Sequence, residues 1–283
     1  MKILNSAVTK NLRIIAASTA FLLMSVAAQA GSIPDELAQK GIALINSMEP
    51  GDGETFLRLT SPKTYVQHSA HSPDGQAATF AMYPMVKGKV HAKVARAFQD
   101  GEFAVIHADL NMFGKDLVTF QIWRFESGLA VEHWDATQPK SGPNPDGNSM
   151  SDGSTEVTDL DKTDANKAVV KGLLENVFIG GKFDQVSTYI SDSKYIQHDS
   201  MVANGLEGLQ KASTVLKDFH MKAVKRILGQ GNFVLAASQA TFNGADIASY
   251  DLFRLENSKI VEHWDVLASI APPSEWKNRN GMF

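Results

Sequence analysis

The sequence predicts two tandem α+β domains, each with helices at its beginning and a mainly antiparallel sheet after them. Three observations predict this fold class. First, separate motifs occur twice at one constant offset of 130 residues. Second, each copy has helical periodicity followed by four strand-like runs. Third, a stretch rich in Pro, Gly, Ser and Asn separates the two copies. A chain of 283 residues also has the length of two ordinary domains.

The repeat rests on two motifs that are far apart in the chain. The pentapeptide VEHWD begins at Val131 and again at Val261, and the tetrapeptides YVQH and YIQH begin at Tyr65 and Tyr195. Both pairs are separated by 130 residues. A constant offset through separate motifs indicates duplication of one domain without net insertion.

The stretch QPKSGPNPDGNSMSDGST between the repeats has no apolar periodicity and is interpreted as a linker. We expect a first copy at residues 31–138, a connecting segment at 139–158, a second copy at 159–271 and a polar C-terminal tail at 272–283.

The second copy shows the expected elements most clearly. It begins with DLDKTDANKAVVKGLLENVFIGG, which carries apolar residues at helical spacing and ends at a Gly pair. Shorter helices are expected at 183–190 and 206–217. Four strand-like runs with turn signals between them follow, namely KAVKRILGQG, NFVLAASQATF, IASYDLFRLE and KIVEHWDVLAS.

The last strand carries the repeated pentapeptide, and its side chains alternate between two faces. His263 and Asp265 share one face with Asp251 of the preceding strand, while Glu262 and Trp264 point to the other. An imidazole between two carboxylates holds its proton more tightly. This cluster is therefore a candidate for proton transfer.

The other face is expected to support the sheet. Trp134 and Trp264 are interpreted as core or interface anchors. Arg254 is expected to form a cross-strand ion pair with Glu262.

The register of the final hairpin depends on its turn. We expect a three-residue turn that pairs Leu255 with Lys259 and places Asp251 opposite His263. In the first copy the left-handed position of this turn falls on Gly128, where glycine carries no steric cost.

The order of these motifs resembles the SnoaL-like polyketide cyclases of the nuclear transport factor 2-like superfamily. The resemblance rests on YIQH after two helices, a glycine opening the next helix, and the hairpin DLFRLENSKIVEHWD, and it covers both copies. It implies a cone-shaped domain whose bent sheet encloses a pocket. Because single-domain members commonly pair through their open sheet faces, it also implies that the two copies form an intramolecular pseudo-dimer. A linker of about 20 residues reaches about 25 Å, which permits this docking.

The resemblance and the strand pattern together select the candidate site residues. The acid/base aspartate of characterised cyclases corresponds to the Asp that ends the repeated motif. The candidate catalytic residues are Asp265, His263, Asp251, Asp135 and His133. The candidate ligand-binding residues are Tyr195, Gln197, His198, Tyr65, Gln67, His68, His91, His107 and Gln121.

Each candidate also has a structural interpretation. The tyrosines can pack in the core with a satisfied hydroxyl, and His68 or His198 can hydrogen-bond a neighbouring backbone group. The His-Asp pairs can form a buried polar network that fixes the last strand. The copies also differ, because the first has Gln121 where the second has Asp251.

We expect neither a metal nor a cofactor. The first copy contains five histidines, but none has a local zinc-ligand spacing such as HExxH. The chain has no cysteine and no G-x-S-x-G elbow, which disfavours nucleophilic catalysis.

Residues 1–30 have the pattern of a secretory signal peptide. Basic residues precede an apolar run from Ile14 to Ala28, and Ala28-Gln29-Ala30 forms a small-x-small cleavage site. A membrane anchor is the alternative, but the run is shorter than the roughly 20 residues of a spanning helix. We expect a periplasmic or secreted protein with no membrane span after cleavage.

Two functions remain open. One is acid/base catalysis, such as an aldol-type cyclisation or isomerisation of a small hydrophobic carbonyl compound. The other is non-catalytic binding of a hydrophobic small molecule by a periplasmic accessory protein. A net charge of −4 and a pI near 6.1 argue against a nucleic-acid partner.

Overall fold

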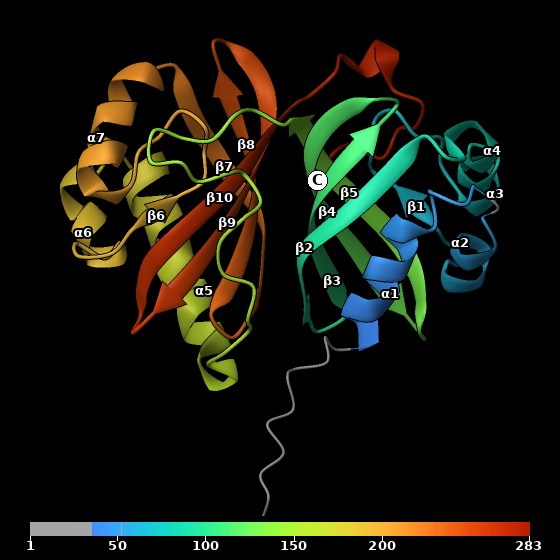
Figure 1. Cartoon of the computed structure of the whole chain (residues 1–283), viewed down its shortest axis with the longest axis horizontal. Helices are drawn as coiled ribbons and strands as arrows, with labels where there is room; N and C mark the ends of the chain where they lie inside the picture. Colours follow the sequence, from blue (N-terminus) through green and yellow to red (C-terminus); the bar gives the residue numbers. More distant parts are fainter. Residues whose placement is uncertain (1–35, 52) are drawn as a thin grey trace, which may run out of the picture. The chain divides into compact units, whose positions relative to one another are not determined.

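The computed structural model describes residues 36–51 and 53–283 (Figure 1). The expected signal peptide lies outside these residues. Within the described ranges, no helix is long and apolar enough to cross a membrane.

The two copies have matching elements. In the first copy they are α1 (Glu36–Asn46), α2 (Glu54–Leu59), β1 (Val66–Gln67), α3 (Gln76–Phe80), α4 (Tyr83–Val86), β2 (Val90–Asp100), β3 (Phe103–Met112), β4 (Lys115–Glu126) and β5 (Leu129–Pro139). In the second copy they are α5 (Thr163–Gly172), a π-helical turn (Leu173–Ile179), α6 (Val186–Tyr189), β6 (Ile196–Gln197), α7 (Gly205–Val215), β7 (Phe219–Gln230), β8 (Phe233–Phe242), β9 (Ala245–Glu256) and β10 (Lys259–Ser269). Short 3₁₀ turns occur at Leu160–Lys162, Phe183–Gln185 and Pro273–Glu275.

Each copy contains a five-stranded sheet, in the orders β1-β5-β4-β3-β2 and β6-β10-β9-β8-β7. The four long strands are antiparallel, and the two-residue strand lies parallel to the last one. In Figure 1 the helices of the second copy lie on one side of its sheet. The predicted α+β fold, with helices packed on a mainly antiparallel sheet, is confirmed in both copies.

Helical spacing explains how the first helix packs. The buried residues of α1 are Ala38, Gly41, Leu44 and Ile45, three or four positions apart, so they form one apolar stripe. Gly41 allows close packing, since a Cβ atom there would lie 3.0 Å from the side chain of Ile106.

Buried apolar side chains form three clusters. One lies inside each copy, and the third combines side chains from the sheets of both copies. Trp134 and Trp264 belong to the third cluster and are 2% and 0% exposed. Their predicted role as buried anchors is confirmed.

The predicted register of the final hairpin is wrong. The turn has two residues, Asn257 and Ser258, both with positive φ, as two-residue hairpin turns that match the strand twist require. A β-bulge after Ile260 shifts the pairing by one more residue, so Asp251 lies opposite Asp265. The turn and the bulge together shift the register by two residues from Glu262 onward, which leaves the side chains of Glu262 to Asp265 on their expected faces.

Candidate functional site

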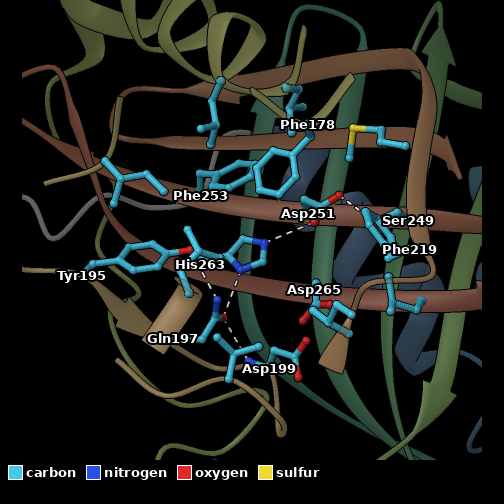
Figure 2. Close-up of a pocket in the computed structure, with 18 residues that line it drawn as sticks. Phe178, Tyr195, Gln197, Asp199, Phe219, Ser249, Asp251, Phe253, His263 and Asp265 are labelled. Carbon is cyan, nitrogen blue, oxygen red and sulfur yellow. Dashed lines mark hydrogen bonds and ion pairs between the residues drawn. The ribbon is translucent and has the colours of Figure 1, made fainter. Parts of the chain in front are cut away.

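A cavity in the second copy lies between its helices and its sheet (Figure 2). It contains about 630 Å³ of space, including the part open to solvent. The wall is mostly apolar, and the π-helical turn contributes Leu173, Leu174 and Phe178 to it. The polar residues of the wall are Tyr195, Gln197, Asp199, Ser249, Asp251, His263 and Asp265.

Strand pairing brings most of these polar groups together. Asp265 of β10 lies directly opposite Asp251 of β9, and His263 pairs with Gln197 of β6. Because alternate residues of β10 share a face, His263 and Asp265 both reach the cavity. The expected cluster of one histidine and two aspartates is therefore present.

Gln197 fixes the orientation and the tautomer of His263. The Gln197 Oε1 atom accepts hydrogen bonds from the backbone N–H groups of His198 at 2.8 Å and Asp199 at 3.0 Å. This identifies the atom as the amide oxygen, which has no hydrogen to donate. His263 Nδ1 lies 3.0 Å from it and must therefore carry a hydrogen.

The other ring nitrogen of His263 contacts Asp251. His263 Nε2 lies 3.2 Å from Asp251 Oδ1, and Ser249 Oγ donates to Asp251 Oδ2 at 2.8 Å. Asp251 thus links the imidazole of His263 to the hydroxyl group of Ser249 in one row of polar contacts across β9 and β10.

Asp265 and Asp199 are the two remaining acids of the cavity. Burial, together with the charges of Asp199 and Asp251, raises the pKa of Asp265 well above its ordinary value. Burial also raises the pKa of Asp199, but the backbone N–H of Met201 at 2.7 Å and the nearby His263 oppose that rise. Both carboxyl groups therefore bind a proton more tightly than a carboxyl group in water, while the Met201 contact favours the carboxylate form of Asp199. The two carboxyl groups lie close together in Figure 2.

Tyr195 completes the polar wall as a neutral phenol. Burial raises the pKa of its hydroxyl, and the neighbouring aspartates add to that effect. Its oxygen accepts a hydrogen bond of 3.3 Å from Gln197 Nε2.

The first copy lacks most of this ionisable cluster. Ser69, Thr119 and Gln121 stand where the second copy has Asp199, Ser249 and Asp251. His133 lies 2.9 Å from Gln67 Oε1 and 2.7 Å from Gln121 Oε1.

Burial shifts the pKa values of the corresponding groups of the first copy, His133 and Asp135. Burial, with a contribution from His68, lowers the pKa of His133 to about 3. Burial raises the pKa of Asp135, the one acid that this copy keeps at the corresponding positions. Tyr65 packs edge-to-face against Phe56 in the core of this copy.

Four candidate histidines lie in other surroundings. His68 and His198 stack on Trp134 and Trp264 and contact Glu132 and Glu262, and His198 does not line the cavity.

The other two are His91 and His107. His91 lies at the surface, 2.9 Å from Glu49. His107 is buried beside Arg96, and burial together with this arginine lowers its pKa well below the ordinary value.

The face opposite the cavity holds the expected ion pair. Arg254 Nε donates to Glu262 Oε2 at 2.6 Å, which confirms the cross-strand pair. Burial alone would raise the pKa of Glu262, but hydrogen bonds from His198 and Arg254 lower it to about 2. The two carboxylates of the motif thus have opposite pKa shifts.

Sequence reasoning missed Asp199 and Ser249. Asp199 directly follows YIQH, but the corresponding residue in the first copy is Ser69, so the repeat gave no signal. It also lies after β6, where strand alternation makes no prediction.

Among the described residues, no group of three or more His, Asp or Glu side chains has the arrangement of a metal site.

Neither a protein-family model nor a curated protein matches the chain. Solved structures do match it, each over a share of the chain close to one copy. One is the "putative ketosteroid isomerase from Kribbella flavida DSM 17836", with 11% identity, 40% of this chain and 84% of that chain covered, and a TM-score of 0.35. Another is the "Putative SnoaL-like polyketide cyclase from Jannaschia Sp. CCS1", with 16% identity, 40% and 91% covered, and a TM-score of 0.33.

A third similar structure is an LEH-like epoxide hydrolase from M. tuberculosis, with 14% identity, 38% of this chain and 84% of that chain covered, and a TM-score of 0.32.

Proposed function

We propose that the chain is an exported tandem SnoaL-like protein whose second copy is a cofactor-independent acid/base catalyst. Its reaction is an aldol-type cyclisation or an isomerisation of a small hydrophobic carbonyl compound. The observation that carries this proposal is a mostly apolar cavity lined by two carboxyl groups with raised pKa values, Asp265 and Asp199, of which Asp199 accepts the backbone N–H of Met201. Such a pair supplies an acid and a base at one pH.

The proposed chemistry needs only these two groups. Asp199 as carboxylate removes a proton from the carbon next to the carbonyl group, while Asp265 gives its proton to the carbonyl oxygen, which forms an enol. Asp265 then takes back the hydroxyl proton. In a cyclisation the enol carbon attacks a second carbonyl group, and the oxygen of that group takes the proton held by Asp199. In the isomerisation of a β,γ-unsaturated ketone the intermediate is a dienol, and its γ-carbon takes the proton held by Asp199.

Neighbouring groups hold this pair in place. His263 and Asp251, which contact each other, form one side of the cavity. Tyr195 remains a neutral hydroxyl group that can contact the ligand. The apolar wall excludes water, which strengthens these interactions.

A non-catalytic function has its own support. Residues 1–30 predict export to the periplasm, where a hydrophobic ligand can be carried or buffered, and the first copy keeps few ionisable groups at the corresponding positions. In this alternative, the cavity binds a hydrophobic small molecule without changing it.

Deuterium exchange into a ketone distinguishes the two functions. The chain without residues 1–30 is incubated in D₂O with a panel of apolar ketones, and loss of the α-proton signal is followed by NMR. We expect faster exchange with the wild-type protein and a loss of about 100-fold or more in Asp265→Asn, in line with removal of a catalytic acid or base.

The first copy provides the matched control. Asp135→Asn changes the corresponding carboxyl group, and we expect it to leave the exchange rate unchanged. Binding of a ketone without any exchange above buffer, for every ketone of the panel, would favour the binding protein.

We also propose that the two copies form an intramolecular pseudo-dimer. Support comes from equivalent contacts in both directions, since Arg226 lies 3.9 Å from the ring centre of Trp134 and Arg96 lies 4.2 Å from that of Trp264. X-ray scattering of the purified chain tests this, because two lobes of variable spacing would contradict it.

A further inference from the structure

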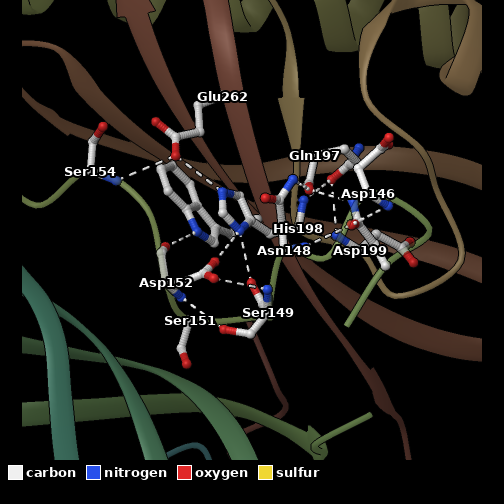
Figure 3. Close-up of polar contacts among 12 residues, drawn as sticks. Asp146, Asn148, Ser149, Ser151, Asp152, Ser154, Gln197, His198, Asp199 and Glu262 are labelled. Atoms are coloured by element: carbon white, nitrogen blue, oxygen red, sulfur yellow. Dashed lines mark hydrogen bonds and ion pairs between the residues drawn. The ribbon is translucent and has the colours of Figure 1, made fainter. Parts of the chain in front are cut away.

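The connecting segment, which the sequence predicts as a linker, contacts the second copy (Figure 3). Its contacts lie at the two ends of the loop from Gln197 to Val202, which carries Asp199. The Asn144 side chain is 4% exposed. Its Nδ2 donates to the backbone oxygen of Gln197 at 2.7 Å and to that of Val202 at 3.0 Å. These oxygens stand on either side of Asp199, so a single amide group ties together the two ends of the loop that carries it.

A second asparagine of the segment holds the same backbone. Asn148 Nδ2 donates to the backbone oxygen of Gln197 at 3.1 Å and to Asn204 Oδ1 at 3.0 Å. Asn204 Oδ1 in turn accepts the backbone N–H of Gln197 at 2.8 Å. Both backbone polar groups of Gln197 are thus held by side chains, and the side chain of Gln197 orients His263.

The segment has internal order that makes it a firm support. Asn144 Oδ1 accepts hydrogen bonds from the backbone N–H groups of Asp146 and Asn148 at 3.0 and 2.9 Å. Further along, the indole N–H of Trp264 donates to the backbone oxygen of Asp152 at 2.9 Å, and Met150 is 2% exposed.

The C-terminal tail makes similar contacts with the first copy. Asn278 Nδ2 donates to the backbone oxygens of Ser69 and Ser72 at 2.6 and 3.0 Å. Asn280 Nδ2 donates to the backbone oxygen of Gln67 and to Asp74 Oδ1, both at 2.9 Å. Each copy is therefore followed by a segment whose asparagines hydrogen-bond the loop after the short parallel strand of the other copy.

We propose that Asn144 and Asn148 are positioning residues for the acid/base site of the second copy. From the segment that follows the first copy, they fix the Gln197–Val202 loop and so set the places of Asp199 and of the Gln197 side chain that orients His263. The inference rests on the proposed function for its kinetic consequence, but its structural part is independent of any activity.

Side-chain ¹⁵N NMR of histidine tests the structural part in the chain without residues 1–30. We expect Asn144→Ala and Asn148→Ala to shift the ring resonances of His263 and to leave those of His133 in place. The control Asn278→Ala removes two hydrogen bonds from the tail to the corresponding loop of the first copy. It should shift the ring resonances of His133 and leave those of His263 in place. Asn148→Ala retains the hydrogen bonds from Asn144 Oδ1 to the backbone N–H groups of residues 146 and 148. A shift of the His263 resonances in this variant is therefore not explained by unfolding of the connecting segment.

Ketone exchange tests the kinetic part. We expect Asn144→Ala to lower the maximal exchange rate about 10-fold with little change in KM, since misplaced catalytic groups lose rate more than binding. Asn278→Ala should retain the wild-type rate.

Two results would overturn the positioning role, namely unchanged His263 resonances in both connecting-segment variants, or equal shifts of His263 in all three variants. If the wild-type protein exchanges no ketone, the proposed function fails, while the resonances still decide whether these asparagines position the site.

Discussion

Replacing Asp265 by asparagine should make the protein more stable at neutral pH. Burial and the neighbouring carboxylates raise the pKa of Asp265 well above 3.8 in the folded state. The folded protein therefore binds a proton more tightly than the unfolded chain, and its stability falls as the pH rises above 3.8. Asparagine keeps the shape of the protonated group and removes this pH-dependent loss.

The size of the gain depends on pH. Each pH unit between the ordinary and the folded-state pKa contributes about 1.4 kcal/mol. The stabilisation by Asp265→Asn should thus be near zero below pH 3.8, grow with about this slope, and level off once the folded-state pKa is passed.

Glu262, three residues earlier in the same strand, should behave in the opposite way. Its pKa falls from 4.5 to about 2 in the folded state, so it stabilises the fold above pH 4.5 and loses that effect as the pH drops towards 2. The shift corresponds to roughly 3 kcal/mol, and we expect Glu262→Gln to cost about 2 kcal/mol at pH 7 after screening.

Urea unfolding of both variants between about pH 2 and pH 7.5, followed by tryptophan fluorescence, measures these differences. A loss of stability in Asp265→Asn at pH 7 would refute the reasoning. In that case Asp265 completes a structural network and the repeated pentapeptide is scaffold.

Three further outcomes follow from contacts on the opposite face. Trp264→Ala should cost about 3 to 5 kcal/mol at every pH in the same urea series, because the indole is fully buried. Gly153→Ala should lower the melting temperature, since Gly153 has a φ of 89° and a Cβ atom there would lie 2.3 Å from Glu262 Oε1; a wild-type melting temperature would mean that the connecting segment is not held there. The double variant Arg96→Ala and Arg226→Ala should increase the radius of gyration in scattering by loosening the two copies, and an unchanged radius would contradict their role in the pseudo-dimer.

The duplication, the order of the elements and the two faces of VEHWD could be read from the residues alone. Alternation along an extended strand is a local property of the backbone, so His263 and Asp265 point to the cavity while Glu262 and Trp264 point away from it. The predicted faces of His263 and Asp265 were correct although the predicted register was wrong, because a shift by an even number of residues keeps each side chain on the same face.

The three-dimensional structure was needed to identify which side chains line the cavity and which contacts position them. Asp199 comes from a loop with no periodic signal, and the turn and bulge that place Asp251 opposite Asp265 depend on the twist of the whole sheet. The asparagines of the connecting segment and of the tail repeat at offsets of 132 and 134 residues rather than 130, so the motif comparison did not align them. Their role arises from hydrogen bonds to backbone groups of the other copy. Because every residue type offers the same backbone acceptor, the residue types at Gln197 and Gln67 do not predict these contacts.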